Sequence, residues 1–168
     1  LQHIMNNGGI FLVALPKGDI GEDVSIALGR LIVAKINALA YYRQSIPKQE
    51  RPFTFLMLDE VQNFVGPSIS NLLSEARQYH MRCVMANQQL SQLSKPMREC
   101  VLGNSKLKFV GRNALATHSY FANEFQLPIE FFQGLDAGDF VFSDMTGAAG
   151  SPKRIQFTDS YLKDRGED

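Results

Sequence analysis

Two adjacent carboxylates, Asp59 and Glu60, directly follow the short apolar run FTFLML at residues 53–58. An apolar run of this length between polar segments is typical of a buried strand. In an open α/β sheet, ligands bind beyond the carboxyl ends of the strands. One carboxylate there can hold Mg²⁺ through a bound water, and a second can orient or deprotonate an attacking water. We therefore expect Asp59 to be the metal-linked residue and Glu60 the base. The alternative is a strand that ends in a solvated acidic turn.

An amide side chain, Gln88, follows the next predicted strand at residues 82–86. The carboxyl ends of parallel strands meet at one edge of a sheet, so we expect Gln88 beside Asp59 and Glu60. An amide both donates and accepts hydrogen bonds, and it can therefore sense a γ-phosphate or position the attacking water. Alone, the polar residues after this strand would be an ordinary loop. Together with the acidic pair, which has the form of a Walker B motif, they are more specific.

Two arginines are further candidates for contact with a nucleotide. Arg77 lies in the predicted helix 68–80, and Arg112 ends a predicted strand. A guanidinium is always charged, and its planar fork of donors suits a phosphoryl group. The alternative for Arg77 is a solvated helix arginine paired with Glu75 or with neighbours of Asp59, and the alternative for Arg112 is an exposed strand residue without a role.

Strands and helices alternate along the chain, which predicts an α/β domain with a mostly parallel sheet flanked by helices. The predicted strands cover residues 10–15, 53–58, 82–86 and 106–112, and the predicted helices cover residues 22–43, 68–80, 96–102 and 114–125. A C-terminal β-hairpin is expected from residues 140–143 and 154–157. The domain is expected to span residues 1–158 and to be followed by a charged, flexible tail at residues 159–168.

Contact with DNA phosphates is less clearly indicated by the sequence. Within the strand 106–112, Lys106, Lys108 and Arg112 alternate with apolar residues, which predicts a face in contact with water. These lysines, or Lys95 and Arg98, could touch phosphates without reading bases, and a solvated surface explains them equally well. Helical spacing favours core packing over base stacking for a cluster of aromatic residues, Tyr120, Phe121, Phe125, Phe131 and Phe132.

Composition limits the possible classes of protein. Of the 168 residues, 45% are hydrophobic and 20% charged, with 17 basic and 17 acidic side chains. This composition excludes a disordered chain and is enough for one domain with a core. No apolar run approaches the roughly 20 residues of a membrane helix, so no membrane segment is expected. Zero formal net charge argues against a protein that coats nucleic acid with its whole surface.

Three segments together resemble a known family: FLMLDEVQNF, LLSEARQYHMRCVMANQQLSQL and GNSKLKFVGRN. They are similar to the HerA/FtsK group of hexameric DNA-translocating ATPases, which are P-loop NTPases with a RecA-like fold. Within that group they most resemble the TraD/TraG-type coupling proteins of conjugative type IV secretion. The upstream segment from GGIFLVAL to AYYR is similar to the strand and helix before Walker B, and LDAGDFVF and KRIQF are similar to late strands. The resemblance covers nearly all of residues 8–157.

The resemblance implies roles for the candidate residues. Asp59 corresponds to the Mg²⁺-linked aspartate, Glu60 to the catalytic glutamate and Gln88 to the sensor glutamine. Arg77 corresponds to an arginine that reaches the nucleotide of a neighbouring subunit, and Arg112 is a weaker candidate for a nucleotide-facing arginine. The implied cofactors are ATP and Mg²⁺ in the intact protein.

The main departure from the family is that no GxxxxGK[ST] sequence occurs in the 168 residues. That loop cradles the β- and γ-phosphates with backbone amides and a lysine. The chain is therefore expected to be the C-terminal part of a RecA-like motor domain, cut after the phosphate loop. By itself it should bind nucleotide poorly and hydrolyse it negligibly.

The resemblance implies part of an ATP-driven translocase that pumps DNA through a hexameric ring during conjugative transfer. Its expected partners are DNA in the central pore, further copies of itself, relaxase and components of the secretion system. A cytoplasmic domain is expected, and an anchor in the bacterial inner membrane, if there is one, would lie outside this chain. The alternative is a non-catalytic scaffold of the same fold that docks relaxase or secretion partners. The joint presence of the acidic pair, Arg77 and Gln88 favours the motor.

Overall fold

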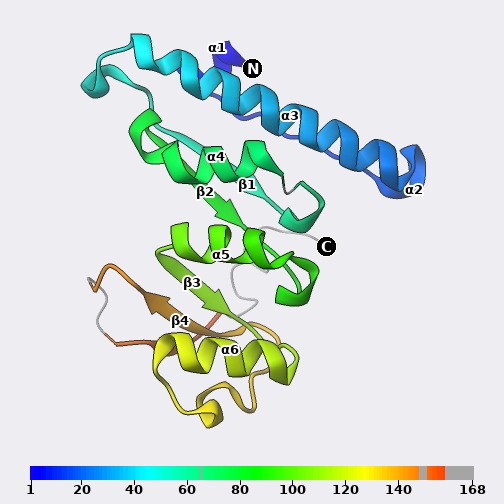
Figure 1. The fold of residues 1–168 in the computed structure, drawn as a ribbon, viewed down its shortest axis with the longest axis vertical. Coiled ribbons are helices and arrows are strands. Elements are labelled where there is room, and N and C mark those ends of the chain that lie inside the picture. Colours follow the sequence, from blue (N-terminus) through cyan, green and yellow to red (C-terminus); the bar gives the residue numbers. More distant parts are fainter. Residues whose placement is uncertain (65, 148–150, 158–168) are drawn as a thin grey trace, which may run out of the picture. The chain divides into compact units, whose positions relative to one another are not determined.

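The structure, a computed structural model, describes residues 1–64, 66–147 and 151–157. The expected tail at residues 159–168 and part of the expected hairpin loop lie outside the described residues. The chain forms two compact units, one of residues 1–104 and one that begins at Ser105 (Figure 1). Each unit is described separately below.

The first unit consists of helices around a two-stranded sheet. Its α-helices are α1 (Gln2–Asn7), α2 (Lys17–Ile20), α3 (Glu22–Tyr42), α4 (Pro67–Glu75) and α5 (Lys95–Asn104), and its strands are β1 (Thr54–Leu58) and β2 (Met81–Met85). Short 3-10 helices are η1 (Arg43–Ser45), η2 (Lys48–Glu50), η3 (Val61–Asn63), η4 (Ala76–Tyr79) and η5 (Leu90–Gln92). The long helix begins where the sequence predicts, directly after Gly21, with two acidic residues in its first turn that suit the helix dipole.

The strands β1 and β2 are parallel, in a register that runs from Thr54 opposite Met81 to Leu58 opposite Met85. The connection between them passes through α4, as the alternation of strand and helix predicts. One face of this sheet packs against α3 and α4 in a shared hydrophobic cluster, whose members include Ile36, Ala40, Leu72, Ala76 and Met81. Alternate strand residues, among them Phe55 and Met57, point to the other face and are exposed.

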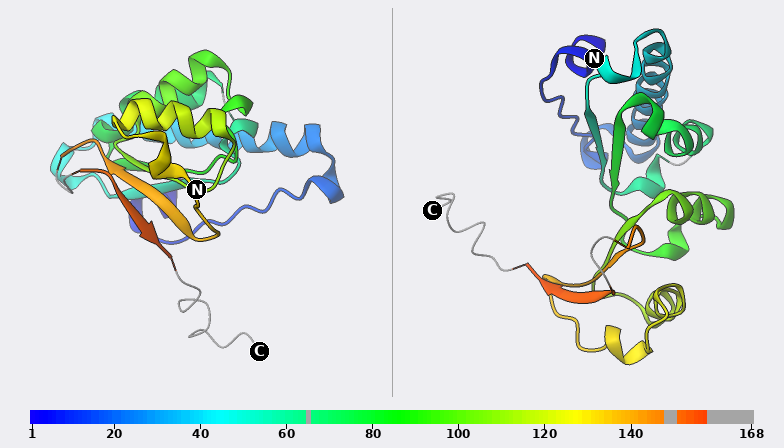
Figure 2. Two further views of the ribbon diagram at one scale, coloured as in Figure 1. Left: turned by 90° about the horizontal axis from the view of Figure 1, so that it is seen from below. Right: turned by 90° about the vertical axis from the view of Figure 1, so that its left-hand side faces the viewer.

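The expected strand at residues 10–15 is not present. These residues are extended but form no ladder, and Ile10 and Leu12 are 83% and 87% exposed. An apolar run predicts a strand only where a neighbouring strand edge is available for its backbone. The N-terminal segment instead runs beside α3 and ends in the short helix α2 (Figure 2).

The second unit is a three-stranded antiparallel sheet with one α-helix. Its elements are β3 (Leu107–Val110), α6 (Leu115–Phe125), η6 (Ile129–Phe132), β4 (Asp139–Asp144) and β5 (Lys153–Gln156). The strand order is β3-β4-β5, and β4 and β5 form the predicted C-terminal hairpin. The prediction of a mostly parallel sheet is therefore wrong for the described strands: one pair is parallel and the larger sheet is antiparallel. A mixed α/β architecture is confirmed.

The buried face of β3 is the opposite of the predicted one. Lys108 is buried, and its Nζ lies 2.6 Å from Glu124 Oε1 on α6. Leu107 and Phe109, on the other face, are 55% and 51% exposed. A period of two defines two faces but does not say which one a helix covers. The prediction of core packing on α6 is confirmed, because Phe121 and Phe125 are buried.

One helical stretch, Glu22–Ser45, is long and apolar enough to cross a membrane among the described residues. A core helix of a soluble protein meets the same criterion of length and composition. Here one side of α3 is buried within the first unit, including Gly29, Val33 and Ala40. The sequence predicts no membrane segment, and the structure contains one weak candidate among the described residues.

Candidate functional site

The carboxyl ends of β1 and β2 are joined by backbone hydrogen bonds that fix the loops following both strands. Ala86 N donates to Leu58 O at 2.9 Å, and Val61 N donates to Ala86 O at 2.9 Å. Between these bonds the chain turns sharply at Glu60, whose φ of 52° is left-handed. Asp59 Oδ1 accepts the Glu60 N–H at 2.9 Å and stabilises this turn. The Asp59 carboxylate therefore takes part in the turn that places Glu60.

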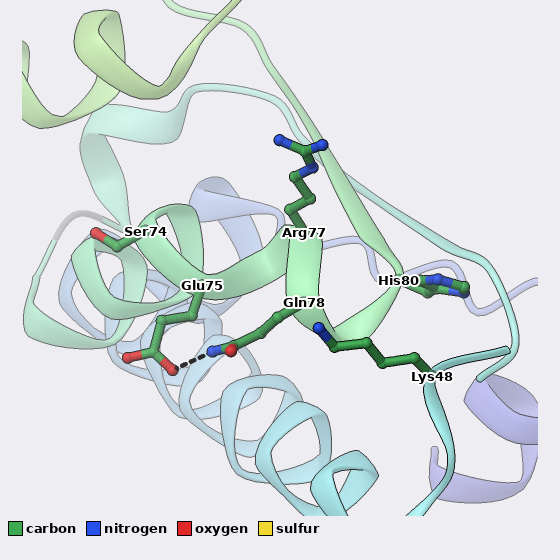
Figure 3. Close-up of a pocket in the computed structure, with 6 residues that line it drawn as sticks. All are labelled: Lys48, Ser74, Glu75, Arg77, Gln78 and His80. Carbon is green, nitrogen blue, oxygen red and sulfur yellow. Dashed lines mark hydrogen bonds between the residues drawn. The ribbon is translucent and has the colours of Figure 1, made fainter. Parts of the chain in front are cut away.

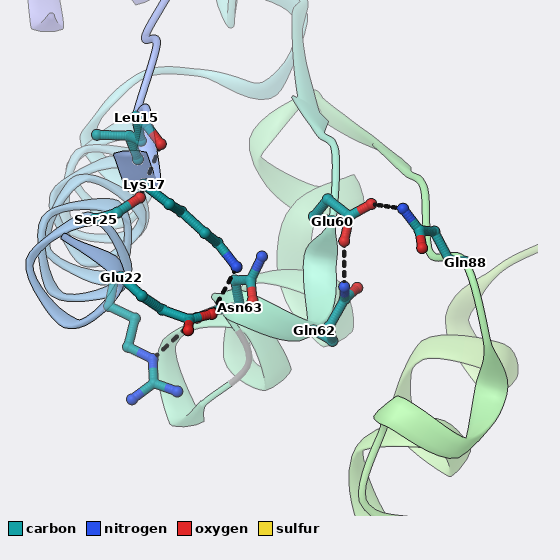
Figure 4. A network of polar contacts seen from close by, with 9 residues as sticks. Leu15, Lys17, Glu22, Ser25, Glu60, Gln62, Asn63 and Gln88 are labelled. Atoms are coloured by element: carbon teal, nitrogen blue, oxygen red, sulfur yellow. Dashed lines mark hydrogen bonds and ion pairs between the residues drawn. The ribbon is translucent and has the colours of Figure 1, made fainter. Parts of the chain in front are cut away.

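The Glu60 carboxylate is held by two amide side chains, one from each loop (Figure 4). Gln88 Nε2 donates to Glu60 Oε1 at 2.6 Å, and Gln62 Nε2 donates to Glu60 Oε2. Asn87 Nδ2 in turn donates to Gln62 Oε1 at 2.8 Å. The structure thus brings together Glu60 and Gln88, as the parallel sheet predicts. Sequence reasoning missed Gln62 and Asn87, although both are polar residues in the same two strand-end loops.

Asp59 is exposed at this edge and fits an outer ligand of Mg²⁺. Its Oδ1 is used in the turn, and within the described part of the chain its Oδ2 has no protein donor. The described residues contain no group of three or more His, Cys, Asp or Glu side chains that could hold a metal ion. Mg²⁺ bound together with a nucleotide needs only one or two protein carboxylates, since waters and phosphates complete its shell. Asp59 therefore suits a water-mediated contact with Mg²⁺, and the described residues do not form a site that surrounds the ion with protein ligands alone.

Arg77 lies on η4, away from the strand-end loops, in a polar surface pocket of about 700 Å³ (Figure 3). The pocket is lined by Lys48, Ser74, Glu75, Arg77, Gln78 and His80. Among the described residues no ion pair joins Arg77 to Glu75, and Glu75 Oε2 instead accepts from Gln78 Nε2 at 3.0 Å and from Tyr79 Oη at 2.8 Å. The Arg77 side chain is exposed, as a residue that contacts another subunit must be. Arg112 is also exposed and lies in the second unit, after β3.

A groove of about 920 Å³ leads along β1 to the acidic pair. Most of its lining is apolar, but Lys17, Ser25 and Asn63 join Asp59 and Glu60 in lining it. Lys17 Nζ lies 2.8 Å from Glu22 Oε1, and its hydrogen bond, followed by its charge, lowers the pKa of that carboxyl (Figure 4). Both partners are exposed to solvent. The groove therefore has one polar end at the edge where the carboxylates lie.

A buried arginine, Arg43, fixes the opposite end of the sheet. Its guanidinium donates to Tyr79 O at 2.9 Å, to Pro52 O at 3.0 Å and to Thr54 Oγ1 at 2.8 Å, and also to Met5 O. Burial lowers the pKa of Arg43, and the nearby charge of Arg51 lowers it further. These bonds join the starts of β1 and β2, so they set the relative position of the two strands that carry the site. Nothing in the local sequence signals this role.

Comparison with known families gives one match. Residues 54–125 match a family model, TraG-D_C, described as the TraM recognition site of TraD and TraG. This segment runs from β1 to the end of α6 and contains all five candidate residues, Asp59, Glu60, Arg77, Gln88 and Arg112. No curated protein matches the chain. The match supports a relationship between this part of the chain and the TraD/TraG-type coupling proteins of conjugation.

Proposed function

We propose that the chain is part of a TraD/TraG-type coupling protein that uses ATP and Mg²⁺ to move DNA during conjugative transfer. In this proposal the intact protein has a RecA-like P-loop motor, assembles as a hexameric ring and passes DNA through its pore. A cytoplasmic location follows from the same role. The family match to residues 54–125 supports the conjugative assignment.

One observation carries the catalytic part of the proposal: Glu60 and Gln88 meet in a 2.6 Å hydrogen bond at the shared edge of two parallel strands. β1 and β2 are parallel neighbours, so the loops that follow them lie at one edge, and a carboxylate from one loop contacts an amide from the other. A scaffold has no physical need for this contact beside an exposed second carboxylate. A nucleotide-hydrolysing site uses groups of these kinds, an acidic residue linked to the metal and a side chain that orients or deprotonates the attacking water.

In the proposed mechanism each side chain has a distinct task. Glu60 accepts a proton from the attacking water, and Gln62 and Gln88 hold its carboxylate in place. Asp59 would hold Mg²⁺ through a water, and the metal would supply charge stabilisation at the phosphates. Arg77, exposed on η4, approaches the nucleotide bound by a neighbouring copy. An arginine contributed in this way makes hydrolysis depend on assembly of the ring.

The test is ATP hydrolysis by the complete protein that carries this chain. Glu60→Gln keeps the shape of the side chain and removes its basicity, and we expect it to lower kcat by about 100-fold or more. Glu99→Gln is the matched control, because Glu99 is an exposed carboxylate on α5. A Glu60→Gln protein that hydrolyses ATP at the wild-type rate contradicts the proposal.

A second candidate function is docking of a conjugation partner, which the description of the matched family favours. That description names TraM recognition, so a TraM-like protein is the partner to test. The same Glu60→Gln variant separates the two functions. If the chain is only a docking scaffold, Glu60→Gln leaves both partner binding and DNA transfer intact. If it is a motor that also docks, the variant keeps binding and loses transfer.

A further inference from the structure

The amide side chains beside Glu60 form a chain of hydrogen bonds with a fixed polarity. An ionised carboxylate accepts hydrogen bonds and donates none, so Gln62 must present its Nε2 to Glu60 (Figure 4). The other end of the same amide, Gln62 Oε1, accepts from Asn87 Nδ2 at 2.8 Å. The carboxylate therefore determines which end of Gln62 meets Asn87, and Asn87 must meet it with a donor.

Backbone hydrogen bonds place Asn87 beside Gln62. Ala86 accepts from Val61 N and donates to Leu58 O, each at 2.9 Å, so the residues that follow Val61 and Ala86 leave the sheet side by side. Val61 is 1% exposed, and its burial anchors the loop that carries Gln62. Asn87 and Gln62 are themselves partly buried. Their contact is shielded in part from water, which strengthens it relative to the same contact on an open surface.

On its other side, the chain of hydrogen bonds continues into the 3-10 helix η5. Asn87 Nδ2 also lies 3.5 Å from Gln92 Oε1, and that oxygen accepts the Gln89 N–H at 3.2 Å. Gln89 and Gln92 form a capping box at the start of η5. Asn87 thus lies between the turn that follows β2 and the side chain that holds Glu60.

We propose that Asn87 is a positioning residue: it keeps the donor end of Gln62 on Glu60 and so links the catalytic carboxylate to the loop of residues 87–92. Asn87 has this role only if Glu60 is the base of the proposed ATPase, so the inference rests on the proposed function. A base accepts a proton efficiently only when its carboxylate is aimed at the attacking water, and small errors of placement lower the rate strongly. Asn87 acts through Gln62, whereas Gln88 contacts the carboxylate directly.

A contact that served only the fold would have different consequences. Its loss would lower the unfolding temperature and leave the kcat of the folded protein unchanged. Loss of a positioning contact lowers kcat and leaves the KM for ATP unchanged, because the contact matters in the transition state and not for nucleotide binding. It also has no effect on kcat once Gln62 can no longer donate to Glu60.

The test is steady-state ATP hydrolysis by the complete protein that carries this chain. Asn87→Leu keeps the shape of the side chain and removes its donor without adding charge. We expect kcat to fall about ten-fold, with the KM for ATP within about two-fold of wild type. Asn104→Leu is the matched control, because it makes the same change at an exposed residue on α5, and it should hydrolyse ATP at the wild-type rate.

Thermal unfolding checks that each variant is folded. Asn87→Ala removes the donor without adding apolar surface. It is the second variant, with the same expected result, if Asn87→Leu lowers the unfolding temperature.

A double-mutant cycle tests whether Asn87 acts through Gln62. Gln62→Met keeps the length of the side chain and removes its donor, and alone it should lower kcat about ten-fold. The double variant with Asn87→Leu should be no slower than Gln62→Met, because the connection from Asn87 to Glu60 is already broken. Two separate losses that multiply to about a hundred-fold would show that Asn87 acts by another route and would overturn the proposal.

Two further results would overturn it: wild-type kcat for folded Asn87→Leu and Asn87→Ala, or a higher KM for ATP with kcat unchanged. The Glu60→Gln variant separates this failure from that of the proposed function. If Glu60→Gln is impaired and the Asn87 variants are not, the positioning role alone is wrong. If Glu60→Gln hydrolyses ATP at the wild-type rate, the proposed ATPase is wrong and the role of Asn87 fails with it.

Discussion

The two units of the molecule use their strands in contrasting ways. In the first unit β1 and β2 are parallel, so both carboxyl ends lie at one edge and bring Glu60 and Gln88 into contact. In the second unit neighbouring strands are antiparallel, and the ends of β3 and β4 point in opposite directions. There alternate side chains such as Phe109 and Phe142 are spread over a face. A parallel pair of strands brings the side chains that follow it together at one edge, as a catalytic site requires. An antiparallel sheet instead presents side chains across a whole face.

The units also bury a cation in contrasting ways. The two terminal nitrogens of Arg43 in the first unit donate to neutral acceptors, three backbone carbonyls and the Thr54 hydroxyl, whereas its buried Nε has no partner among the described residues. Lys108 in the second is paired with the Glu124 carboxylate at 2.6 Å. Both cations tie together segments that are distant in sequence. Removing each cation should therefore have a different effect on stability.

The largest stability effect is expected for Arg43→Ala. The change removes four hydrogen bonds, two of them buried, and the packing of the Arg43 side chain, and it should lower the free energy of unfolding by about 3–5 kcal/mol. Urea denaturation followed by circular dichroism measures it. Arg30→Ala is the control, because Arg30 is exposed and donates one 3.3 Å bond to Asn63 O, and it should cost less than about 0.5 kcal/mol. A loss below about 1 kcal/mol for Arg43→Ala would show that these bonds do not hold the sheet together.

A chemical probe can report on the first unit alone, because Cys83 and Cys100 are the only cysteines of the chain and both lie there. Burial raises the pKa of Cys83 to about 11. At pH 8 its thiolate fraction should make alkylation on the order of 100-fold slower than in the urea-unfolded chain. Mass spectrometry of iodoacetamide-treated protein measures this rate.

The same shift gives a pH dependence with a definite sign. Since the folded pKa of Cys83 lies above the unfolded one, its contribution to stability is complete below about pH 8.5 and is lost as the pH rises toward 11. Equal alkylation rates in the folded and unfolded chains would contradict this prediction, because they would show that the Cys83 thiol is accessible to solvent in the folded chain.

A smaller effect is expected for the ion pair of the second unit. Lys108→Met leaves the partly buried Glu124 carboxylate without its cation and should cost about 1–3 kcal/mol. The double change Lys108→Met with Glu124→Leu should recover most of that loss, because an apolar pair of similar volume carries no desolvation cost. Thermal unfolding measures both. Alkylation of Cys83 should be unchanged by these substitutions; an acceleration would mean that the two units unfold together.

The sequence predicted well those features that depend on local pattern. The strands at β1, β2 and β3, the hairpin of β4 and β5, and the helices α3 and α6 all follow from apolar spacing. The adjacency of Glu60 and Gln88 followed from one further rule, that parallel strands end at a common edge.

Features that depend on distant partners could not be predicted. Residues 10–15 have the pattern of a strand, but pairing requires an edge that the local sequence does not specify. Lys108 is buried because Glu124, sixteen positions away, lies above it on α6. Arg43 finds its acceptors near residues 5, 52, 54 and 79, which no spacing rule connects. In each case the missing information is which segments come together in space.

The central claim is that the edge formed by Asp59, Glu60 and Gln88 drives DNA transfer, and the most direct test is the transfer frequency from donor cells whose coupling protein carries Glu60→Gln. The Glu60→Gln donors should give a transfer frequency about 100-fold lower than wild-type donors. Glu99→Gln donors should transfer at the wild-type frequency, and both variants should bind the partner as the wild type does. Wild-type transfer by the Glu60→Gln donors would contradict it and leave docking as the function of this chain.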